Sequence, residues 1–266
     1  CGAICNRRCE DACTRGTVDN AVAIDEIKKF IAEQELYARN RYIPQMLNYS
    51  GKPFPEKIAV IGAGPAGMSA AFYLKRSGYP VTVFEKERPG GMLLNGIPSF
   101  RLEKDVIEAE IDVLRSMGVE FRCGIEVGRD TTIEKLRREG YKAFYVAIGA
   151  QDGRRAGIPG EEAEGVLTGL EFLRSVNQDA ADVRLAGRTV VIGGGNVAVD
   201  VARTALRAGS EAAAMYCLET RETMPAAADE VAEALEEGIT ICNSWGPKEI
   251  IMENGRVSGV VFKKCI

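Results

Sequence analysis

The run KIAVIGAGPAG, residues 57–67, decides the fold of this chain. It begins as an apolar strand pattern, and Gly62, Gly64 and Gly67 follow with the spacing G-x-G-x-x-G at the start of a predicted helix. In this setting the first glycine permits a tight turn, the second lets a pyrophosphate approach the backbone, and the third allows close packing of helix and strand. The run therefore predicts a dinucleotide site, and the alternative is a glycine turn that serves packing alone.

An acidic residue at the right distance strengthens this interpretation. A strand is predicted at 81–84, after the helix, and completes a β-α-β unit. Glu85 stands at the end of that strand, 23 residues after Gly62. A carboxylate there can accept hydrogen bonds from the hydroxyl groups of a ribose, which favours a bound dinucleotide over a packing turn.

The same pattern recurs later in the chain. A predicted strand at 189–192 leads into a second glycine turn, GGGNVA at 193–198, and then into a helix and a strand at 212–216. This turn matches the variant of the motif that ends in alanine. Two copies of one supersecondary unit predict an α/β fold with two Rossmann-like dinucleotide-binding domains.

Two residues after the second unit give opposite signals about its nucleotide. Glu219 would repel the 2′-phosphate of NADP(H), which favours NAD(H). The guanidinium of Arg221 could hold that phosphate instead. We favour NAD(H), and NADP(H) stays open.

Composition excludes several classes of protein. The chain has 266 residues, of which 46% are hydrophobic and 27% charged, so it is long and apolar enough for about two folded domains rather than a disordered segment. Its net charge of −4 argues against a nucleic-acid partner, because such proteins normally carry a basic face. The longest uncharged stretch, 58–74, is interrupted by glycine and proline, so no membrane span is expected.

Four cysteines, Cys1, Cys5, Cys9 and Cys13, recur at every fourth residue. Thiolates this close together in an enzyme of intracellular type favour a metal centre over disulfides, and an iron–sulfur cluster fits best. Structural zinc remains an alternative, as do disulfides or reactive thiols, although the chain has no histidine for a mixed zinc site. The other cysteines stand singly in strand-like segments and are expected to be small core residues: Cys123, Cys217, Cys242 and Cys265.

These features divide the chain into three parts. A helix is predicted at 25–40 and a linker at 44–55, which contains proline and glycine. An apolar run predicts a strand at 143–148, and Asn254-Gly255 predicts a two-residue hairpin turn near the end of the chain. We therefore predict a helical cysteine-rich segment at 1–50, a first dinucleotide-binding domain at 53–160 and a second at 185–266.

The two kinds of site belong together only if something converts between them. A nicotinamide exchanges two electrons as hydride, whereas an iron–sulfur cluster passes one electron at a time. Flavin can do both, so one FAD and one nicotinamide dinucleotide are the most economical occupants of the two glycine turns.

Five runs carry a resemblance to a known family: CGAICNRRCEDACTRG at 1–16, IAVIGAGPAG at 58–67, GGMLLNGIP at 90–98, FRL at 100–102 and GGGNVA at 193–198. They closely resemble the glutamate synthase small (beta) subunit family, and the N-terminal half of dihydropyrimidine dehydrogenase is similar. The resemblance covers nearly the whole chain. It implies a cytoplasmic NAD(P)H oxidoreductase module, with the nicotinamide domain inserted in the FAD domain. FAD would accept hydride and pass single electrons, through 4Fe-4S clusters of this chain and of a partner, to a partner catalytic subunit or domain. Cys1, Cys5, Cys9 and Cys13 are the candidate ligands in this chain, and which cysteine serves which cluster stays open.

The resemblance also implies the residues of both nucleotide sites. For FAD these are Gly62, Gly64, Pro65, Ala66 and Gly67 at the pyrophosphate, Glu85 at the adenosine ribose with Lys86 beside it, Gly91, Met92, Leu93, Ile97 and Arg101 toward the flavin, Val127 at the adenine, and Ala147 and Gly149 where the chain crosses beside the cofactor. For the nicotinamide dinucleotide they are Gly194, Gly195, Asn196, Val197 and Asp200. Glu219 and Arg221, chosen above from their charge and their place after the second unit, complete this site. The alternative for Leu93, Ile97 and Val127 is a place in the core.

The chain departs from the family pattern in three respects. The return strand and last flavin-contacting motif are expected beyond Ile266, and further cysteines are expected before Cys1, so we expect a fragment with an incomplete flavin site. Relatives commonly have arginines for the 2′-phosphate where this chain has CLE at 217–219, which supports NAD(H).

Two other functions stay open. A stand-alone disulfide reductase would share the paired nucleotide domains, but it would need a redox C-x-x-C that is missing around Cys217 and Cys242. A non-catalytic subunit that senses NAD(H) would need no flavin.

Overall fold

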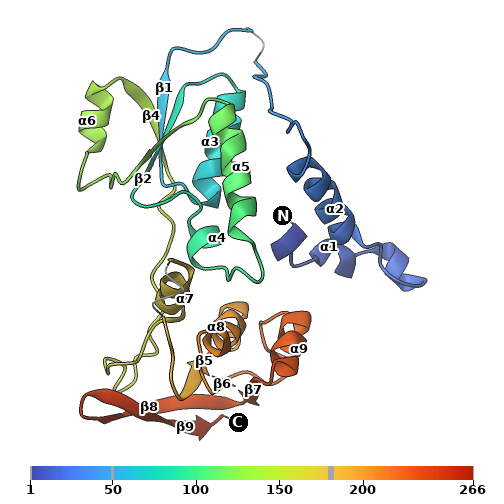
Figure 1. Ribbon diagram of the computed structural model, residues 1–266, viewed down its shortest axis with the longest axis vertical. Helices are drawn as coiled ribbons and strands as arrows, with labels where there is room; N and C mark the ends of the chain where they lie inside the picture. Colours follow the sequence, from blue (N-terminus) through green and yellow to red (C-terminus); the bar gives the residue numbers. More distant parts are fainter. Residues whose placement is uncertain (1, 49–50, 179–182, 266) are drawn as a thin grey trace. The chain divides into compact units, whose positions relative to one another are not determined.

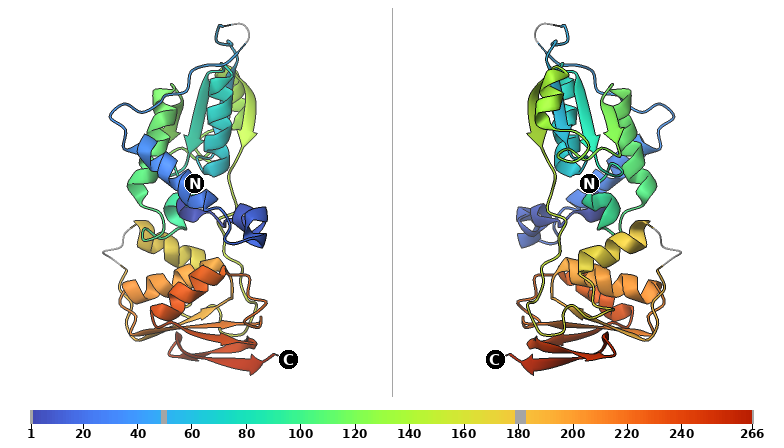
Figure 2. Two further views of the ribbon diagram at one scale, coloured as in Figure 1. Left: turned by 90° about the vertical axis from the view of Figure 1, so that its right-hand side faces the viewer. Right: turned by 90° about the vertical axis from the view of Figure 1, so that its left-hand side faces the viewer.

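The computed structural model describes residues 2–48, 51–178 and 183–265. The chain divides into two compact units. Unit 1 comprises Cys1–Leu94 and Ser99–Ala150, and unit 2 comprises Asn95–Pro98 and Gln151–Ile266. Each unit has its own parallel sheet with helices packed on it (Figures 1 and 2).

Unit 1 is built on a four-stranded parallel sheet with the strand order β3-β2-β1-β4. The strands are β1 (Lys57–Ile61), β2 (Val81–Glu85), β3 (Glu120–Cys123) and β4 (Tyr141–Val146). The helices are α1 (Arg8–Asp11), α2 (Ile24–Leu36), α3 (Pro65–Arg76), α4 (Met92–Asn95), α5 (Lys104–Ser116) and α6 (Ile133–Arg138), with short 3₁₀ turns at Gly2–Ile4 and Thr14–Thr17.

The central strands β1 and β2 are almost continuously apolar because both faces of the sheet are covered. Helices α3 and α5 cover one face, where Val60, Val83 and Leu114 belong to one buried cluster (Figure 1). On the other face Leu136 of α6 packs with Phe84 in a second cluster. This packing fixes the end of β1 and the start of α3 at the carboxyl edge of the sheet.

The N-terminal segment of unit 1 is attached to the sheet domain through α5 and α3. Arg41 forms ion pairs with Glu35 and Glu110 and donates a hydrogen bond to the Ala109 carbonyl at 2.7 Å. Further along, the Leu47 amide donates to the Arg76 carbonyl at 2.7 Å. The helix predicted at 25–40 ends at Leu36, and the chain then follows these contacts instead.

Unit 2 has a three-stranded parallel sheet of order β5-β6-β7 and a separate antiparallel hairpin of β8 and β9. The elements are α7 (Gly169–Gln178), β5 (Arg188–Ile192), α8 (Asn196–Arg207), β6 (Ala212–Cys217), α9 (Ala228–Glu236), β7 (Thr240–Asn243), β8 (Trp245–Glu253) and β9 (Arg256–Lys264). Helices α7 and α9 flank α8 over one large buried cluster that includes Met215 and Val199. On the hairpin side the rings of Tyr216 and Phe262 stack, with centroids 3.9 Å apart.

The hairpin forms where Asn254 and Gly255 predict it. Both residues have positive φ, 53° and 80°, as a two-residue turn of this type requires.

Other predictions need correction. The strand predicted at 143–148 runs from Tyr141 to Val146, because its register is set by pairing with β1. Cys217 is buried as predicted, whereas Cys123 is exposed, because β3 is the edge strand of its sheet. Cys242 and Cys265 are half-buried. Within the described part of the chain, no helix is both long and apolar enough to cross a membrane.

Candidate functional site

Two glycines of the first turn are required by packing. Gly62 has a φ of 103°, and a methyl group placed on it would lie 2.3 Å from the Ala147 carbonyl oxygen. A methyl group on Gly67 would lie 1.9 Å from the Gly62 carbonyl oxygen. Any side chain at these positions would overlap backbone atoms, so their glycines would be needed with or without a ligand.

Gly64 is different, because the fold itself leaves room for a side chain there. Its φ of −75° is ordinary, and a methyl group on it would come no closer than 4.0 Å to the nearest atom, the Cα of Gly91. Gly64 is the residue before α3, and Pro65 and Ala66 of the first helical turn are exposed. The space beside Gly64, at a helix N-terminus with free N–H groups, fits a pyrophosphate.

Glu85 lies at this turn, as the sequence predicts. Its Oε2 accepts a hydrogen bond from the Ala63 amide at 2.7 Å, and its Oε1 accepts one from the Glu87 amide at 3.0 Å. The two amides fix the carboxylate beside the turn, and the next residue, Lys86, is exposed.

The loop after β2 also approaches the turn. A methyl group on Gly91 would lie 2.7 Å from the Gly64 Cα, so Gly91 packs directly on the turn and carries Met92 and Leu93, which are half-buried. Arg101 is half-buried as well. Ile97 belongs to the segment that groups with unit 2.

The remaining residues implied for FAD have mixed environments. Ala147 donates its amide to the Ile61 carbonyl at 2.8 Å and lies against Gly62. Gly149 is exposed with a φ of 74°. The side chain of Val127 packs on the Phe84 cluster, as its core alternative proposes, so only its backbone is left for the predicted adenine contact.

Sequence reasoning missed Lys104 in this region. It is the first residue of α5, and its Nζ donates a hydrogen bond to the Leu93 carbonyl at 3.2 Å. Burial lowers the pKa of Lys104 to about 8. A signal exists in the sequence, because a lysine at the start of a helix opposes the helix dipole and implies a specific partner.

The second turn has the same arrangement of glycines as the first. Gly193 has a φ of 143°, and Gly195 is the residue before α8 with a φ of −96°. A methyl group on Gly195 would come no closer than 4.0 Å to Pro225 Cγ. Gly195 therefore corresponds to Gly64, and the space beside it also fits a pyrophosphate.

The acidic residue of the second unit lies close to its turn. A methyl group on Gly194 would lie 2.9 Å from both Glu219 Oε2 and Cys217 Cβ. Arg221 is exposed. The structure thus brings Glu219 to the turn, as predicted.

The side chain of Asn196, the first residue of α8, forms hydrogen bonds with residues at the start of α9. Its Oδ1 accepts a hydrogen bond from the Ala227 amide at 2.8 Å, and its Nδ2 donates to Glu230 Oε1 at 3.2 Å. Val197 next to it is half exposed, whereas Asp200 is buried. Asn196 therefore holds the start of α9 beside the turn.

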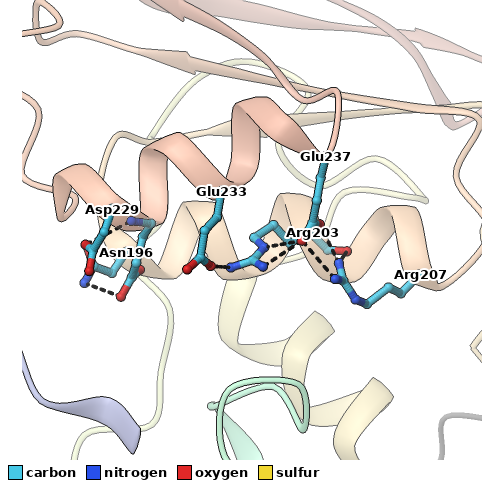
Figure 3. A network of polar contacts seen from close by, with 7 residues as sticks. Asn196, Arg203, Arg207, Asp229, Glu233 and Glu237 are labelled. Atoms are coloured by element: carbon cyan, nitrogen blue, oxygen red, sulfur yellow. Dashed lines mark hydrogen bonds and ion pairs between the residues drawn. The ribbon is translucent and has the colours of Figure 1, made fainter. Parts of the chain in front are cut away.

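A network of ion pairs continues this contact between α8 and α9 (Figure 3). Arg203 pairs with Glu233 at 2.5 Å and with Glu237 at 2.6 Å, and Arg207 pairs with Glu237 at 2.6 Å. Hydrogen bonds from Arg207 and Arg203 lower the pKa of Glu237 to about 2. The network fixes α9 along the helix that follows the second turn.

The N-terminal cysteines have separate surroundings. Cys5 and Cys13 are half-buried and Cys9 is exposed, while Cys1 lies outside the described residues. Lys28 Nζ donates to Cys5 Sγ at 3.2 Å and also pairs with Asp25. Backbone hydrogen bonds from Val22 and Arg15 lower the pKa of Cys13. Among the residues that the structure describes, no three Cys, His, Asp or Glu side chains are grouped as metal ligands, so Cys5, Cys9 and Cys13 do not form a cluster site here.

Residues 56–264 match the family model for pyridine nucleotide-disulphide oxidoreductases. Among solved structures, FprA from Mycobacterium tuberculosis in complex with NADPH is similar with a TM-score of 0.67 and 19% identity, over 79% of this chain and 64% of that chain. At that identity the likeness concerns the fold alone.

Three curated relatives align over nearly the whole of this chain. The beta subunit of NADP(+)-dependent formate dehydrogenase from Moorella thermoacetica is 37% identical over 97% of this chain and 39% of its own length. Subunit PreT of NAD-dependent dihydropyrimidine dehydrogenase from Escherichia coli K12 is 35% identical over 97% of this chain and 62% of its own. The small chain of glutamate synthase [NADPH] from Halomonas elongata is 38% identical over 98% of this chain and 56% of its own. The chain thus spans 39% to 62% of the length of these relatives.

Proposed function

Because the chain belongs to the pyridine nucleotide-disulphide oxidoreductase family, we propose that it is an FAD-dependent NAD(P)H oxidoreductase module. The turn at Gly62–Gly67 would bind FAD, and the turn at Gly193–Ala198 would bind the nicotinamide dinucleotide. The relatives described above are subunits of NADP(+)-, NAD- and NADPH-dependent enzymes, which supports this general kind of reaction.

One observation carries the proposal. Packing accounts for Gly62 and Gly67, but it does not account for Gly64, where a methyl group would meet nothing closer than 4.0 Å. The same holds for Gly195 in the second turn. A glycine that the fold does not need, at the start of a helix, is what the approach of a phosphate to the backbone requires.

The chain's own residues would hold FAD through position and charge. The backbone at Gly64 and the first turn of α3 would receive the pyrophosphate, Glu85 would accept hydrogen bonds from the adenosine ribose, and Gly91 keeps the following loop against the turn. FAD supplies the exchange between hydride and single electrons.

For the second site we propose NAD(H) rather than NADP(H). Glu219 Oε2 lies 2.9 Å from the position of a methyl group on Gly194, where its charge would oppose a 2′-phosphate, whereas Arg221 is exposed. Replacement of Glu219 by alanine together with Leu218→Arg should raise the use of NADPH relative to NADH. An unchanged ratio would refute the assigned ribose contact.

We further propose that a partner subunit or domain accepts the electrons, and that the protein acts in the cytoplasm. The cysteine segment is the proposed site of a 4Fe-4S cluster, which would require Cys5, Cys9 and Cys13 to be brought together with a further thiolate. Iron analysis of Cys5→Ser and Cys9→Ser variants tests this point, with Cys123→Ser as the control. Iron content equal to that of the control would return these cysteines to a structural role.

The central test compares two valine substitutions. Gly64→Val should abolish retention of FAD, because the new side chain would occupy the space beside the turn, where its Cβ comes no closer than 4.0 Å to the fold. The matched control is Gly259→Val in strand β9, where a methyl group meets Ile251 at an ordinary 3.7 Å. Flavin absorbance of the purified complete protein is the measurement, with circular dichroism to verify folding. Full flavin content in Gly64→Val would show that the FAD site lies elsewhere.

A further inference from the structure

Glu219 stands on a corner that the next strand holds in place. Strand β6 ends at Cys217, and Glu219 follows two residues later. Three donors converge on the Glu219 carbonyl oxygen: the Ser244 amide at 3.0 Å, Asn243 Nδ2 at 3.3 Å and Cys217 Sγ at 3.7 Å. The first two come from the end of β7, so the backbone of Glu219 is fixed from a neighbouring strand.

Asn243 makes a second contact on the same corner. Its Nδ2 also donates to Cys217 Sγ at 3.2 Å, and Asn243 is the register partner of Cys217 between β6 and β7. One half-buried amide therefore bridges both ends of the segment from Cys217 to Glu219.

The residue after Asn243 keeps an uncommon backbone conformation at this place. Ser244 has a φ of 62°, in the left-handed region that non-glycine residues seldom adopt. Its amide bonds to Glu219, and its carbonyl accepts from the Cys265 amide at 2.8 Å. These two bonds hold the conformation and tie the corner to the end of the hairpin.

The first unit also supports the backbone of its acid from the next strand, because the Glu85 carbonyl accepts a hydrogen bond from the Ile125 amide, just beyond β3, at 3.1 Å. There the acid itself, Glu85, stands at the strand end, where it is the register partner of Cys123 and accepts a hydrogen bond from the Ala63 amide of the turn. In the second unit a cysteine takes the position of Glu85 and Asn243 takes that of Cys123. The acid of the second unit lies two residues farther on, and it needs another element to bring it to Gly194.

We propose that Asn243 is a positioning residue for nucleotide choice, and that it acts by holding Glu219 beside the second glycine turn. The inference rests on the proposed function, since it deepens the role assigned there to Glu219. Asn243 itself contacts no nucleotide in this proposal. Its loss releases the corner and lets the carboxylate move away from the ribose.

The test is a double-mutant cycle on the complete protein with Asn243→Leu and Glu219→Ala. We expect Asn243→Leu to lower the ratio of the NADPH to the NADH dissociation constant by about fivefold, the order expected when one hydrogen bond is lost. In the Glu219→Ala background the same change should have no further effect on the ratio, because residues that act through one another are not additive. Binding is measured by titration calorimetry.

The matched control is Asn177→Leu. Asn177 is also half-buried in unit 2, and its Nδ2 donates to the Asn95 carbonyl at 3.0 Å. Its loss removes a comparable bond away from the corner and should leave the ratio unchanged. If leucine at 243 prevents folding, Asn243→Ala removes the same donor without added bulk.

The outcomes separate the two proposals. If Glu219→Ala leaves the ratio unchanged, the assigned ribose contact is wrong and this inference fails with it. If Glu219→Ala lowers the ratio but neither Asn243 variant does, the site assignment stands and the positioning role is overturned. An equal effect of Asn243→Leu with and without Glu219 also overturns the role, because Asn243 would then act by another route.

Discussion

The two glycine turns share one sequence pattern, but they differ in how tightly their backbones pack and in which elements support them. At the third motif position the first turn has Gly67, where a methyl group would overlap the Gly62 carbonyl oxygen at 1.9 Å. The second turn has Ala198 there, whose Cβ lies 3.4 Å from the position of a methyl group on Gly193. The first turn is tighter, and its acid is held by the turn itself, whereas the second depends on β7 and α9 for its acid and its Asn196.

The comparison shows that a glycine of the motif can be present for either of two reasons. Gly62 and Gly67 are needed by packing, while packing leaves Gly64 and Gly195 free, and the ligands proposed above would account for them. Substitutions at these positions should therefore separate stability from binding.

The largest effect is expected from Gly67→Ala. The methyl group has no room beside the Gly62 carbonyl, so unit 1 should lose about 3 kcal/mol of stability in urea unfolding. Gly259→Ala, which meets an ordinary contact at 3.7 Å, is the control. A loss no larger than that of the control would show that the first turn is as loose as the second.

Next in size is Gly195→Val, which should raise the NADH dissociation constant by at least about tenfold while FAD content stays normal. The reason is that Gly195 has space in the fold but not with a pyrophosphate beside it. Calorimetric titration with NADH and the flavin absorbance of the same sample are the measurements. Normal NADH affinity would show that the second turn is not the nicotinamide site.

A smaller effect is expected from the different ways in which the helices after the two turns are held. Helix α3 packs on the sheet through a buried apolar cluster, whereas α8 is also tied to α9 through Glu237. Glu237→Gln should cost about 1 kcal/mol at pH 7. Because the folded pKa of about 2 lies below the ordinary 4.5, the carboxylate stabilises the fold above about pH 4.5, and this advantage is lost as the pH falls toward 2.

Urea unfolding of the wild type and Glu237→Gln at several pH values measures this difference. The difference in the free energy of unfolding between the two proteins should be largest at neutral pH and should decrease steadily in acid. A gap independent of pH would mean that the network does not depend on the charge of Glu237.

The smallest effect concerns Lys104, which donates a hydrogen bond to the Leu93 carbonyl in α4. Its folded pKa of about 8 is below the ordinary 10.5, so the unfolded chain binds more protons between these values and stability should rise with pH there. Lys104→Met should remove this rise, which we expect to be below about 1 kcal/mol because the group is only partly buried. Unfolding at pH 7.5 and 9.5 checks it, and equal slopes in both proteins would contradict it.

Local sequence was sufficient for the elements around the turns. The predicted strands at 57–61 and 189–192 and the Asn254-Gly255 hairpin are found almost to the residue, because strong apolar runs and residues suited to positive φ act locally. Strands β3 and β7 and helix α9 were not predicted. The two strands are only four residues long, and tertiary pairing decides their position.

The candidate sites divide in the same way. Glu85 and Glu219 could be chosen from their place after a strand, and both lie at their turns. The partners of Lys104, Asn243 and Ser244 could not be inferred from the sequence, because each of these residues donates to a backbone carbonyl group distant along the chain. The recurrence of cysteine at every fourth residue suggested an iron–sulfur cluster. Among the described residues, however, no three side chains are grouped as metal ligands.

By itself the sequence determined that this chain has two strand-turn-helix units with glycine turns, since periodicity, glycine spacing and turn chemistry are local properties of the chain. Only the tertiary structure decided which glycines serve packing and which leave space for a ligand, and which strand holds the acid of each unit. Those decisions depend on distances between atoms far apart in sequence, which are fixed only when the strands pair and the helices pack.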